Sequence, residues 1–251
     1  MLNLRIQYQL MNLKKQVPNL LTLLNLFSGC VAILFVMQSD FTAAFACVCL
    51  GIFFDFFDGF FARLFQVSSP LGLQLDSLAD MVTSGVVPGL VMHSLLVESA
   101  GNSTTLFAQF MPYMGFLITL ASCYRLANFN LDTRQTDSFI GLPTPANALF
   151  ILSLPLVAIH SSSFLVFELL LNHAVLLLIT LISVYMLNAE IPLFSLKIKG
   201  SNWKSYKLQL VFVVYSVVLL GLLKITAVPV IIISYVLASV VNNLLFTKPK
   251  L

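Results

Sequence analysis

The sequence predicts an all-α, polytopic membrane protein with about eight transmembrane helices (six to eight) and an N-terminal interfacial amphipathic helix. Of its 251 residues, 59% are hydrophobic and 9% are charged, compared with about 45–50% and about 25% in soluble proteins. The mean hydropathy is +0.97. So few charges cannot cover the surface of a soluble fold, and most of this surface must face lipid. The same composition excludes a disordered chain, a disulfide scaffold and a nucleic-acid-binding domain.

Apolar runs define the predicted spans, because a helix needs about 20 apolar residues to cross a bilayer. Eight runs qualify: residues 19–37, 41–62, 73–97, 105–124, 143–160, 164–187, 208–223 and 225–246. The fifth run contains three prolines and the last two form a tight hairpin, so the count extends from six to eight. Before them, residues 1–17 mix apolar and basic residues, as in a helix that lies in the membrane interface. We do not expect a cleavable signal, because the basic segment is long and no small-residue cleavage site follows it.

The basic residues predict the orientation of these spans. In the eight-span arrangement all of the 13 Lys and Arg residues except Lys224 lie on one side, and the positive-inside rule makes that side cytoplasmic. Both termini then lie in the cytoplasm. No polar stretch is long enough for a separate soluble domain. We therefore expect one membrane domain over residues 1–251, with the interfacial helix at 1–17, a core at 18–150 and further helices at 151–251.

Four aspartates are expected to converge near the cytoplasmic face. Asp55 and Asp58 are three residues apart near the end of the second span, and Asp76 and Asp80 are four apart near the start of the third. Each pair therefore lies on one face of its helix. The turn between the spans makes the two helices antiparallel, so both pairs lie at one depth, roughly 6–12 Å inside the cytoplasmic helix ends.

Such a cluster is costly in an apolar setting unless cations complete it. Arg63 is the one fixed cation nearby in the sequence, and it cannot balance four carboxylates. All-oxygen ligands select hard cations, so we predict Mg²⁺ or Mn²⁺, with Ca²⁺ as an alternative. Two such ions about 3.5–4 Å apart would suit displacement at phosphorus. Two other interpretations stay open: structural pairing of the acids, and a divalent-cation transporter with acids near mid-membrane and access from both faces.

Small residues beside the acids leave room for a ligand. Gly59 and Ala62 leave the helix surface bare next to the first acidic pair, so a flat group or a phosphate can approach the backbone. Arg63 is then placed to meet a phosphate oxygen. Gly72 is expected to permit the turn into the third span.

These residues follow the signature of a known family. The chain resembles the CDP-alcohol phosphatidyltransferases, whose motif is Asp-x2-Asp-Gly-x2-Ala-Arg-x8-Gly-x3-Asp-x3-Asp. All eight fixed positions are present: Asp55, Asp58, Gly59, Ala62, Arg63, Gly72, Asp76 and Asp80. Further segments are similar to those of the phosphatidylserine synthase branch: 17–25, 75–88, 124–130 and 139–145. The chain departs from that branch at residues 83–85, Thr-Ser-Gly, where many members have Ser-Phe-Gly.

The resemblance implies an enzyme of the bacterial cytoplasmic membrane that transfers a phosphatidyl group from CDP-diacylglycerol to L-serine and releases CMP. It also implies a divalent cation, Mg²⁺ or Mn²⁺, and a homodimer. Asp55, Asp58 and Asp76 would bind the metal ions. Asp80 would be both a ligand and the general base that accepts the proton of the serine hydroxyl. The residues that would lie against the CDP group are Asp55, Gly59, Ala62, Arg63 and Gly72.

Polar residues at the cytoplasmic end of the fourth span are candidates for the acceptor site. Arg125, Asn128 and Asn130 are expected to hold the serine carboxylate, although many relatives carry a basic residue in place of Asn128. The alternative is that these side chains snorkel to the interface and cap the helix. The nearest rival function is a sibling transferase that uses glycerol 3-phosphate, inositol phosphate or choline. A phosphorylated acceptor favours several basic residues, and only Arg63, Arg125 and Arg134 lie on the relevant loops.

Overall fold

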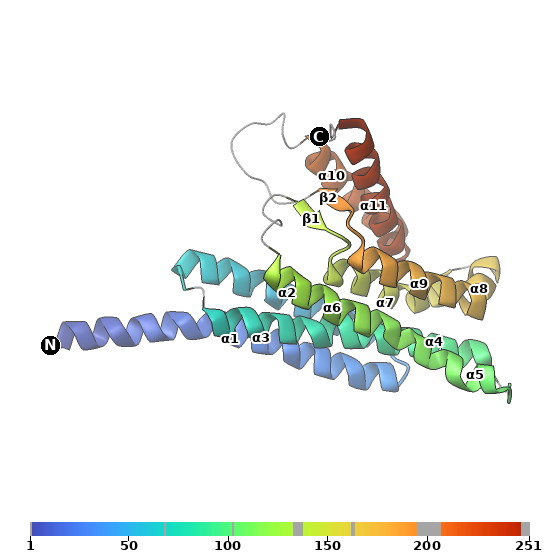
Figure 1. The fold of residues 1–251 in the computed structure, drawn as a ribbon, viewed down its shortest axis with the longest axis horizontal. Helices are drawn as coiled ribbons and strands as arrows, with labels where there is room; N and C mark the ends of the chain where they lie inside the picture. The colour runs from blue at the N-terminus through green and yellow to red at the C-terminus, as the bar shows by residue number, and fades with distance from the viewer. Residues whose placement is uncertain are drawn as a thin grey trace.

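The computed structural model describes residues 2–67, 69–101, 103–132, 138–161, 164–194 and 207–246. In these ranges the protein is an assembly of apolar helices with one short two-stranded sheet (Figure 1). Strands β1 (Ser138–Ile140) and β2 (Pro192–Phe194) are antiparallel. The helical membrane class is confirmed, and the small sheet is an addition that the sequence did not predict.

The first half of the chain forms these elements in order: α1 (Leu2–Met37), α2 (Phe41–Phe65), α3 (Pro70–Asp80), the π-helical turn η1 (Met81–Val86), α4 (Val87–Ala100), α5 (Leu106–Phe110), the 3₁₀ turn η2 (Met111–Phe116) and α6 (Leu117–Leu131). The second half forms α7 (Thr144–His160), α8 (Phe164–Leu171), α9 (His173–Asn188), α10 (Lys207–Leu223), the 3₁₀ turn η4 (Lys224–Thr226) and α11 (Ala227–Phe246). In Figure 1, α1, α3 and α6 run along the long axis, whereas α10 and α11 stand at a steep angle to them.

The first helix differs from its prediction. We expected an interfacial helix over 1–17 and a separate span from residue 19, but α1 continues from Leu2 to Met37 with Pro18 inside it. A proline removes one backbone hydrogen bond, and the other bonds of this long helix carry it through that position. The part that is long and apolar enough to cross a membrane is Gln16–Met37. The preceding part extends beyond the bundle in Figure 1.

Capping residues mark both ends of α2 and the start of α3. Asp40 accepts a hydrogen bond from the N–H of Ala43 at 2.9 Å and starts α2. Gln66, with a positive φ of 55°, ends it. Ser69 then accepts from the N–H of Gly72 at 3.0 Å, and Pro70 occupies the first turn of α3, which are typical helix-start features. The two helices that carry the acids are thus joined by a few residues.

The count of eight spans is not confirmed. Five helical stretches of the described residues are long and apolar enough to cross a membrane, and there are six if the bent pair α8–α9 is one span. The fifth predicted span corresponds to α7, whose 17 residues are fewer than a full crossing usually needs. The predicted span 164–187 is bent by 68° between α8 and α9. Asn172 caps α9 at this bend by accepting from the N–H of Ala174 at 2.9 Å.

The last apolar stretch, Gln209–Asn243, is a helical hairpin. The ring centroids of Phe212 in α10 and Tyr235 in α11 are 5.7 Å apart, whereas one continuous helix would separate these residues by roughly 35 Å. The chain reverses near Lys224, whose φ is 52°. The hairpin is tied to the sheet because the Tyr235 hydroxyl donates to the carbonyl of Phe194 at 2.8 Å. The seventh and eighth predicted spans are therefore separate helices.

Three segments meet at Thr83, just beyond the last acid of the motif. A Cβ atom on Gly29 of α1 would lie 2.5 Å from Thr83 Oγ1, and one on Gly51 of α2 would lie 2.8 Å from Thr83 Cγ2. The Thr83 hydroxyl also donates to the carbonyl of Asn25 at 3.2 Å. Small residues permit such close contacts between membrane helices. This packing sets the spacing of α1, α2 and η1 beside the acidic residues.

Candidate functional site

Three of the four motif aspartates come together between α2 and α3. One carboxylate oxygen from each of Asp55, Asp58 and Asp76 lies within 4.8 Å of the others. Asp58 is buried, with 6% of its surface exposed, and the other two are partly buried. Among the described residues this is the one group of acids, histidines or cysteines with metal-binding spacing.

Asp80 lies one turn beyond Asp76, outside this group of three. Its Oδ1 atom accepts a hydrogen bond from Nδ2 of Asn25 at 3.1 Å. It is still close enough to interact electrostatically with Asp55 and Asp76. Asp80 is thus adjacent to the acidic group but held separately, which distinguishes its position from that of the other three.

Helix α1 supplies two side chains that orient the acids, and the sequence analysis missed both. The Thr22 hydroxyl lies 2.5 Å from Asp58 Oδ2, and Asn25 binds Asp80. Thr22 is 3% exposed and Asn25 is fully buried. A signal for them existed in the sequence: Asn19, Thr22 and Asn25 recur every three residues along an otherwise apolar helix, which places them on one side of it.

The acidic group fits a hard divalent cation. Asp76 Oδ1 is buried and has no hydrogen-bond partner among the described residues, and such an orphaned anionic oxygen is costly unless a cation completes it. Arg63 is exposed, with its guanidinium beside Gly59. All three ligand candidates supply oxygen, the donor that Mg²⁺, Mn²⁺ and Ca²⁺ prefer. Asp55, Asp58 and Asp76 are therefore the residues that would hold the ion.

A cavity of about 170 Å³ adjoins the acids between α1, α2 and α3. The motif residues that line it are Asp58, Gly59, Ala62, Gly72 and Asp76, and α1 adds Pro18, Asn19 and Thr22. Arg63 is at the surface and does not line this cavity. Gly59, Ala62 and Gly72 therefore border the same cavity, as expected of residues that contact one ligand.

The expected role of Gly72 needs correction. Gly72 lies inside the first turn of α3 and has no positive φ, so it does not make the turn between the spans. A Cβ atom at this position would lie 3.2 Å from Ser69 Oγ and 3.3 Å from Asn19 Oδ1. Its lack of a side chain leaves room for these two polar groups at the cavity.

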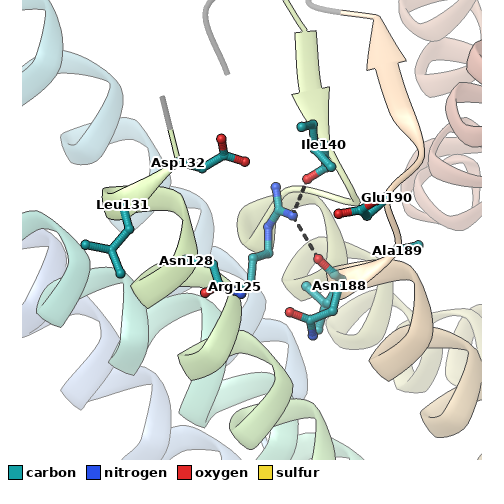
Figure 2. A pocket seen from close by; sticks show the side chains of 9 residues that line it. Arg125, Asn128, Leu131, Asp132, Ile140, Asn188, Ala189 and Glu190 are labelled. Atoms are coloured by element: carbon teal, nitrogen blue, oxygen red, sulfur yellow. Dashed lines mark hydrogen bonds between the residues drawn. The ribbon is translucent and has the colours of Figure 1, made fainter. Parts of the chain in front are cut away.

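A second, larger cavity of about 390 Å³ lies at the end of α6, between β1, α9 and the residues that follow α9 (Figure 2). Arg125 forms part of its wall and is 7% exposed. Its Nη1 atom donates to the carbonyls of Ile140 and Leu187, both at 2.8 Å. A Cβ atom on Gly141, where φ is 75°, would lie 2.8 Å from that nitrogen. Arg125 is thus a buried group that ties α6 to β1 and to the end of α9, not a side chain that snorkels to the interface.

The three acceptor-site candidates do not all lie together. Asn128 lines the second cavity with Arg125. Asn130 instead donates to Ser77 Oγ on α3 at 2.8 Å and joins α6 to the segment that carries Asp76. Glu190, which no motif of the sequence singles out, lines the same cavity from the segment between α9 and β2. No spacing rule relates Glu190 to Arg125, because the fold and not a helix period brings them together.

Comparison with known proteins identifies the family. Residues 15–185 match the family described as CDP-alcohol phosphatidyltransferase. The chain is 32% identical over 133 residues to the CDP-diacylglycerol–serine O-phosphatidyltransferase of Bacillus subtilis, and 33% identical over 136 residues to that of Helicobacter pylori strain J99. It is also 33% identical over 147 residues to the archaetidylserine synthase of Methanothermobacter thermautotrophicus.

These matches cover about half of the chain: 51%, 53% and 57% of it in the same order. They cover 69%, 54% and 59% of the relatives, so for two of the three the chain spans little more than half of the relative's length. The matched family region contains the acids, the cavity beside them and Arg125. The protein belongs to the CDP-alcohol phosphatidyltransferase family.

Proposed function

We propose that the protein transfers a phosphatidyl group from CDP-diacylglycerol to L-serine, which gives phosphatidylserine and CMP. The observation that carries the proposal is the group of three carboxylates, with one orphaned oxygen, beside a cavity lined by the small residues of the family motif. Relatives named as serine transferases support serine as the acceptor.

The proposed metal is Mg²⁺ or Mn²⁺. The site could hold two such ions, and Ca²⁺ is an alternative to them. Asp55, Asp58 and Asp76 would hold the ion, and Thr22 orients Asp58 through its hydroxyl. When bound, the cation neutralises the diphosphate and stabilises the negative charge that develops on the leaving group. The carboxylates alone would repel the diphosphate, so the cation is needed for binding as well as for chemistry.

The first cavity accepts the CDP part of the donor. Gly59, Ala62 and Gly72 leave the helix surfaces bare, and Asn19 and Ser69 supply polar groups at the same place. Arg63, exposed and close to Gly59, is placed to meet a phosphate oxygen at the edge of the cavity. The diacylglycerol chains then remain in the lipid.

Asp80 is the general base. The serine hydroxyl oxygen forms a bond to the phosphorus that carries diacylglycerol, the bond from that phosphorus to the CMP oxygen breaks, and the hydroxyl proton passes to Asp80. Asn25 holds Asp80 Oδ1, which leaves Oδ2 to accept the proton. A positioned carboxylate assists a hydroxyl nucleophile in this way.

Arg125 and Asn128 hold the acceptor in the second cavity. A guanidinium binds a carboxylate with two parallel hydrogen bonds, and only Nη1 of Arg125 is used in the bonds to the two carbonyls. Asn130, whose amide donates to Ser77 Oγ, would act on the site by fixing α6 against α3.

An acceptor screen tests the proposal. Purified protein in detergent with CDP-diacylglycerol and Mn²⁺ is expected to release CMP when L-serine is added, and not with glycerol 3-phosphate, inositol phosphate or choline. A chelator should stop the release. Turnover with glycerol 3-phosphate in place of L-serine would show that the protein is a sibling transferase with another acceptor.

We also propose eight spans with both termini in the cytoplasm of a bacterial cytoplasmic membrane. The support is the placement of every Lys and Arg except Lys224 on one side, and the apolar α10–α11 hairpin with Lys224 at its tip. A homodimer stays a prediction from the family resemblance.

Cysteine labelling distinguishes eight spans from six. In a variant whose four cysteines are replaced by alanine, Lys224→Cys and Gly101→Cys should react with an impermeant maleimide applied to intact cells. Gln66→Cys should react only after permeabilisation. If Lys224→Cys behaves like Gln66→Cys, the α10–α11 hairpin does not cross the membrane and the eight-span proposal is wrong.

A further inference from the structure

The second cavity presents both signs of charge to a ligand. The residues that line it include Arg125 and two acids, Asp132 at the end of α6 and Glu190 between α9 and β2 (Figure 2). Arg125 is buried and Glu190 is exposed, so the positive group lies deep and the negative group lies at the rim. A cavity with this charge pattern suits a small ligand that itself carries both charges.

The cavity lies level with the proposed base. Ser77 of α3 contacts Asn130 of α6, and the position of Gly85 in η1 faces Ser122 of α6. From the first contact to the second, the residue number rises by eight in α3–η1, from 77 to 85, and falls by eight in α6, from 130 to 122. The two segments are therefore antiparallel and keep step with each other. Along the shared axis Arg125 therefore lies level with residue 82 and Asn128 with residue 79, so both lie at nearly the same height in the bundle as Asp80.

Arg125 is positioned by bonds that leave donors for a ligand. Its Nη1 atom binds the carbonyls of Ile140 and Leu187, and Nε and Nη2 make no hydrogen bond among the described residues. Figure 2 shows both bonds leaving the same end of the guanidinium. The fixed guanidinium can thus accept a carboxylate without giving up the contacts that hold it.

Building on the function proposed above, we propose that Glu190 selects the acceptor by its ammonium group. Arg125 binds the carboxylate of the amino acid, Glu190 binds its ammonium group, and the hydroxymethyl group is left to point towards Asp80. Glycerol 3-phosphate and inositol phosphate carry no cation for Glu190 to bind. Choline has no carboxylate and leaves the buried donors of Arg125 unpaired.

Two inhibitors that differ only in the ammonium group test this assignment. L-alanine keeps both charges of L-serine but has no hydroxyl, and propionate also lacks the ammonium group. With wild-type protein, L-alanine is expected to compete with L-serine at least about tenfold better than propionate, because one charge pair is worth at least this much when partly shielded from water.

Glu190→Gln should remove the difference. It is expected to raise the KM for L-serine and the inhibition constant of L-alanine about tenfold, to leave that of propionate unchanged, and to change kcat by less than about threefold. Glu190→Asp should recover part of the effect. Glu168→Gln, an exposed acid on α8 outside the cavity, is the matched control and should leave all four constants unchanged.

The outcomes separate this inference from the function on which it rests. If wild-type protein uses L-serine but Glu190→Gln keeps the wild-type preference for L-alanine over propionate, the role of Glu190 is wrong and the function stands. An equal loss of affinity for both inhibitors would also overturn it, because that indicates a general disturbance of the cavity. If L-serine does not support CMP release although CDP-diacylglycerol binds with Mn²⁺, the proposed function itself is wrong.

Discussion

Asp80→Asn is expected to lower kcat for CMP release by about 10²–10⁴-fold, which is the usual contribution of a general base. The substitution keeps the size of the side chain, and its amide oxygen can still accept the hydrogen bond from Asn25. It removes the ability to take the hydroxyl proton. The measurement is the rate of CMP release at saturating L-serine and CDP-diacylglycerol, with Mn²⁺-dependent nucleotide binding measured on the same preparation.

Nucleotide binding by Asp80→Asn should stay within a few-fold of wild type, because Asp80 lies outside the group of three acids. Asp40→Asn is the matched control, since Asp40 caps α2 at the end remote from the motif and asparagine is an equally good cap. Near-normal turnover by Asp80→Asn would exclude Asp80 as the base.

Asp55→Asn is expected to weaken Mn²⁺-dependent nucleotide binding by at least about a hundredfold. The substitution removes a charged ligand from the group, and even the outer partners of metal ligands change affinity by about 10–100-fold when they are lost. The measurement is a Mn²⁺ titration of CMP or CDP-diacylglycerol binding, which reports the metal site without depending on turnover.

Glu98→Gln serves as the control for Asp55→Asn, because Glu98 lies near the far end of α4 and outside both cavities. Its titration should match that of the wild type. If Asp55→Asn binds nucleotide with an unchanged cation requirement, Asp55 is not a metal ligand and the site must be rebuilt around other residues.

The spacing of the aspartates along their helices was enough to predict that the central acids lie close together. Asp55 and Asp58 share a helix face, as do Asp76 and Asp80. Because α2 ends at Phe65 and α3 begins at Pro70, the short connection favours an antiparallel arrangement of the two helices. The structure accordingly places Asp55, Asp58 and Asp76 within reach of one ion. Each of these relations extends over only a few turns of helix, where periodicity is informative.

Helix periodicity could not predict contacts between segments that are far apart in the sequence. The bond from Thr22 to Asp58 depends on how α1 rotates about its axis when it packs on α2, and helix period does not determine that rotation. Glu190 lies at the cavity of Arg125 because α9 packs on α6 and β1 pairs with β2. Asn130 was assigned to the acceptor, but the close approach of α6 to α3 brings its amide to Ser77.

The number of spans shows a limit of hydropathy. Apolar composition measures how much of a segment can face lipid, but it does not report the direction of the segment. The predicted span 164–187 is apolar throughout and still bends by 68° at Asn172, because that side chain caps a new helix. The Gln209–Asn243 stretch is apolar and reverses at Lys224. Both changes of direction occur at single polar residues inside apolar runs.

The two hydrogen bonds from Arg125 to the carbonyls of Ile140 and Leu187 have a consequence for engineering. One nitrogen joins the end of α9 to the strand before α7, and a lysine could not replace it, since a compact ammonium lacks the planar fork that serves the scaffold and a ligand at once. Redesign of the alcohol that this enzyme uses should therefore begin at the exposed corner between α9 and β2. Arg125 should be kept, because its replacement would break the contacts that join α9 to β1 before it changed the preference for an acceptor.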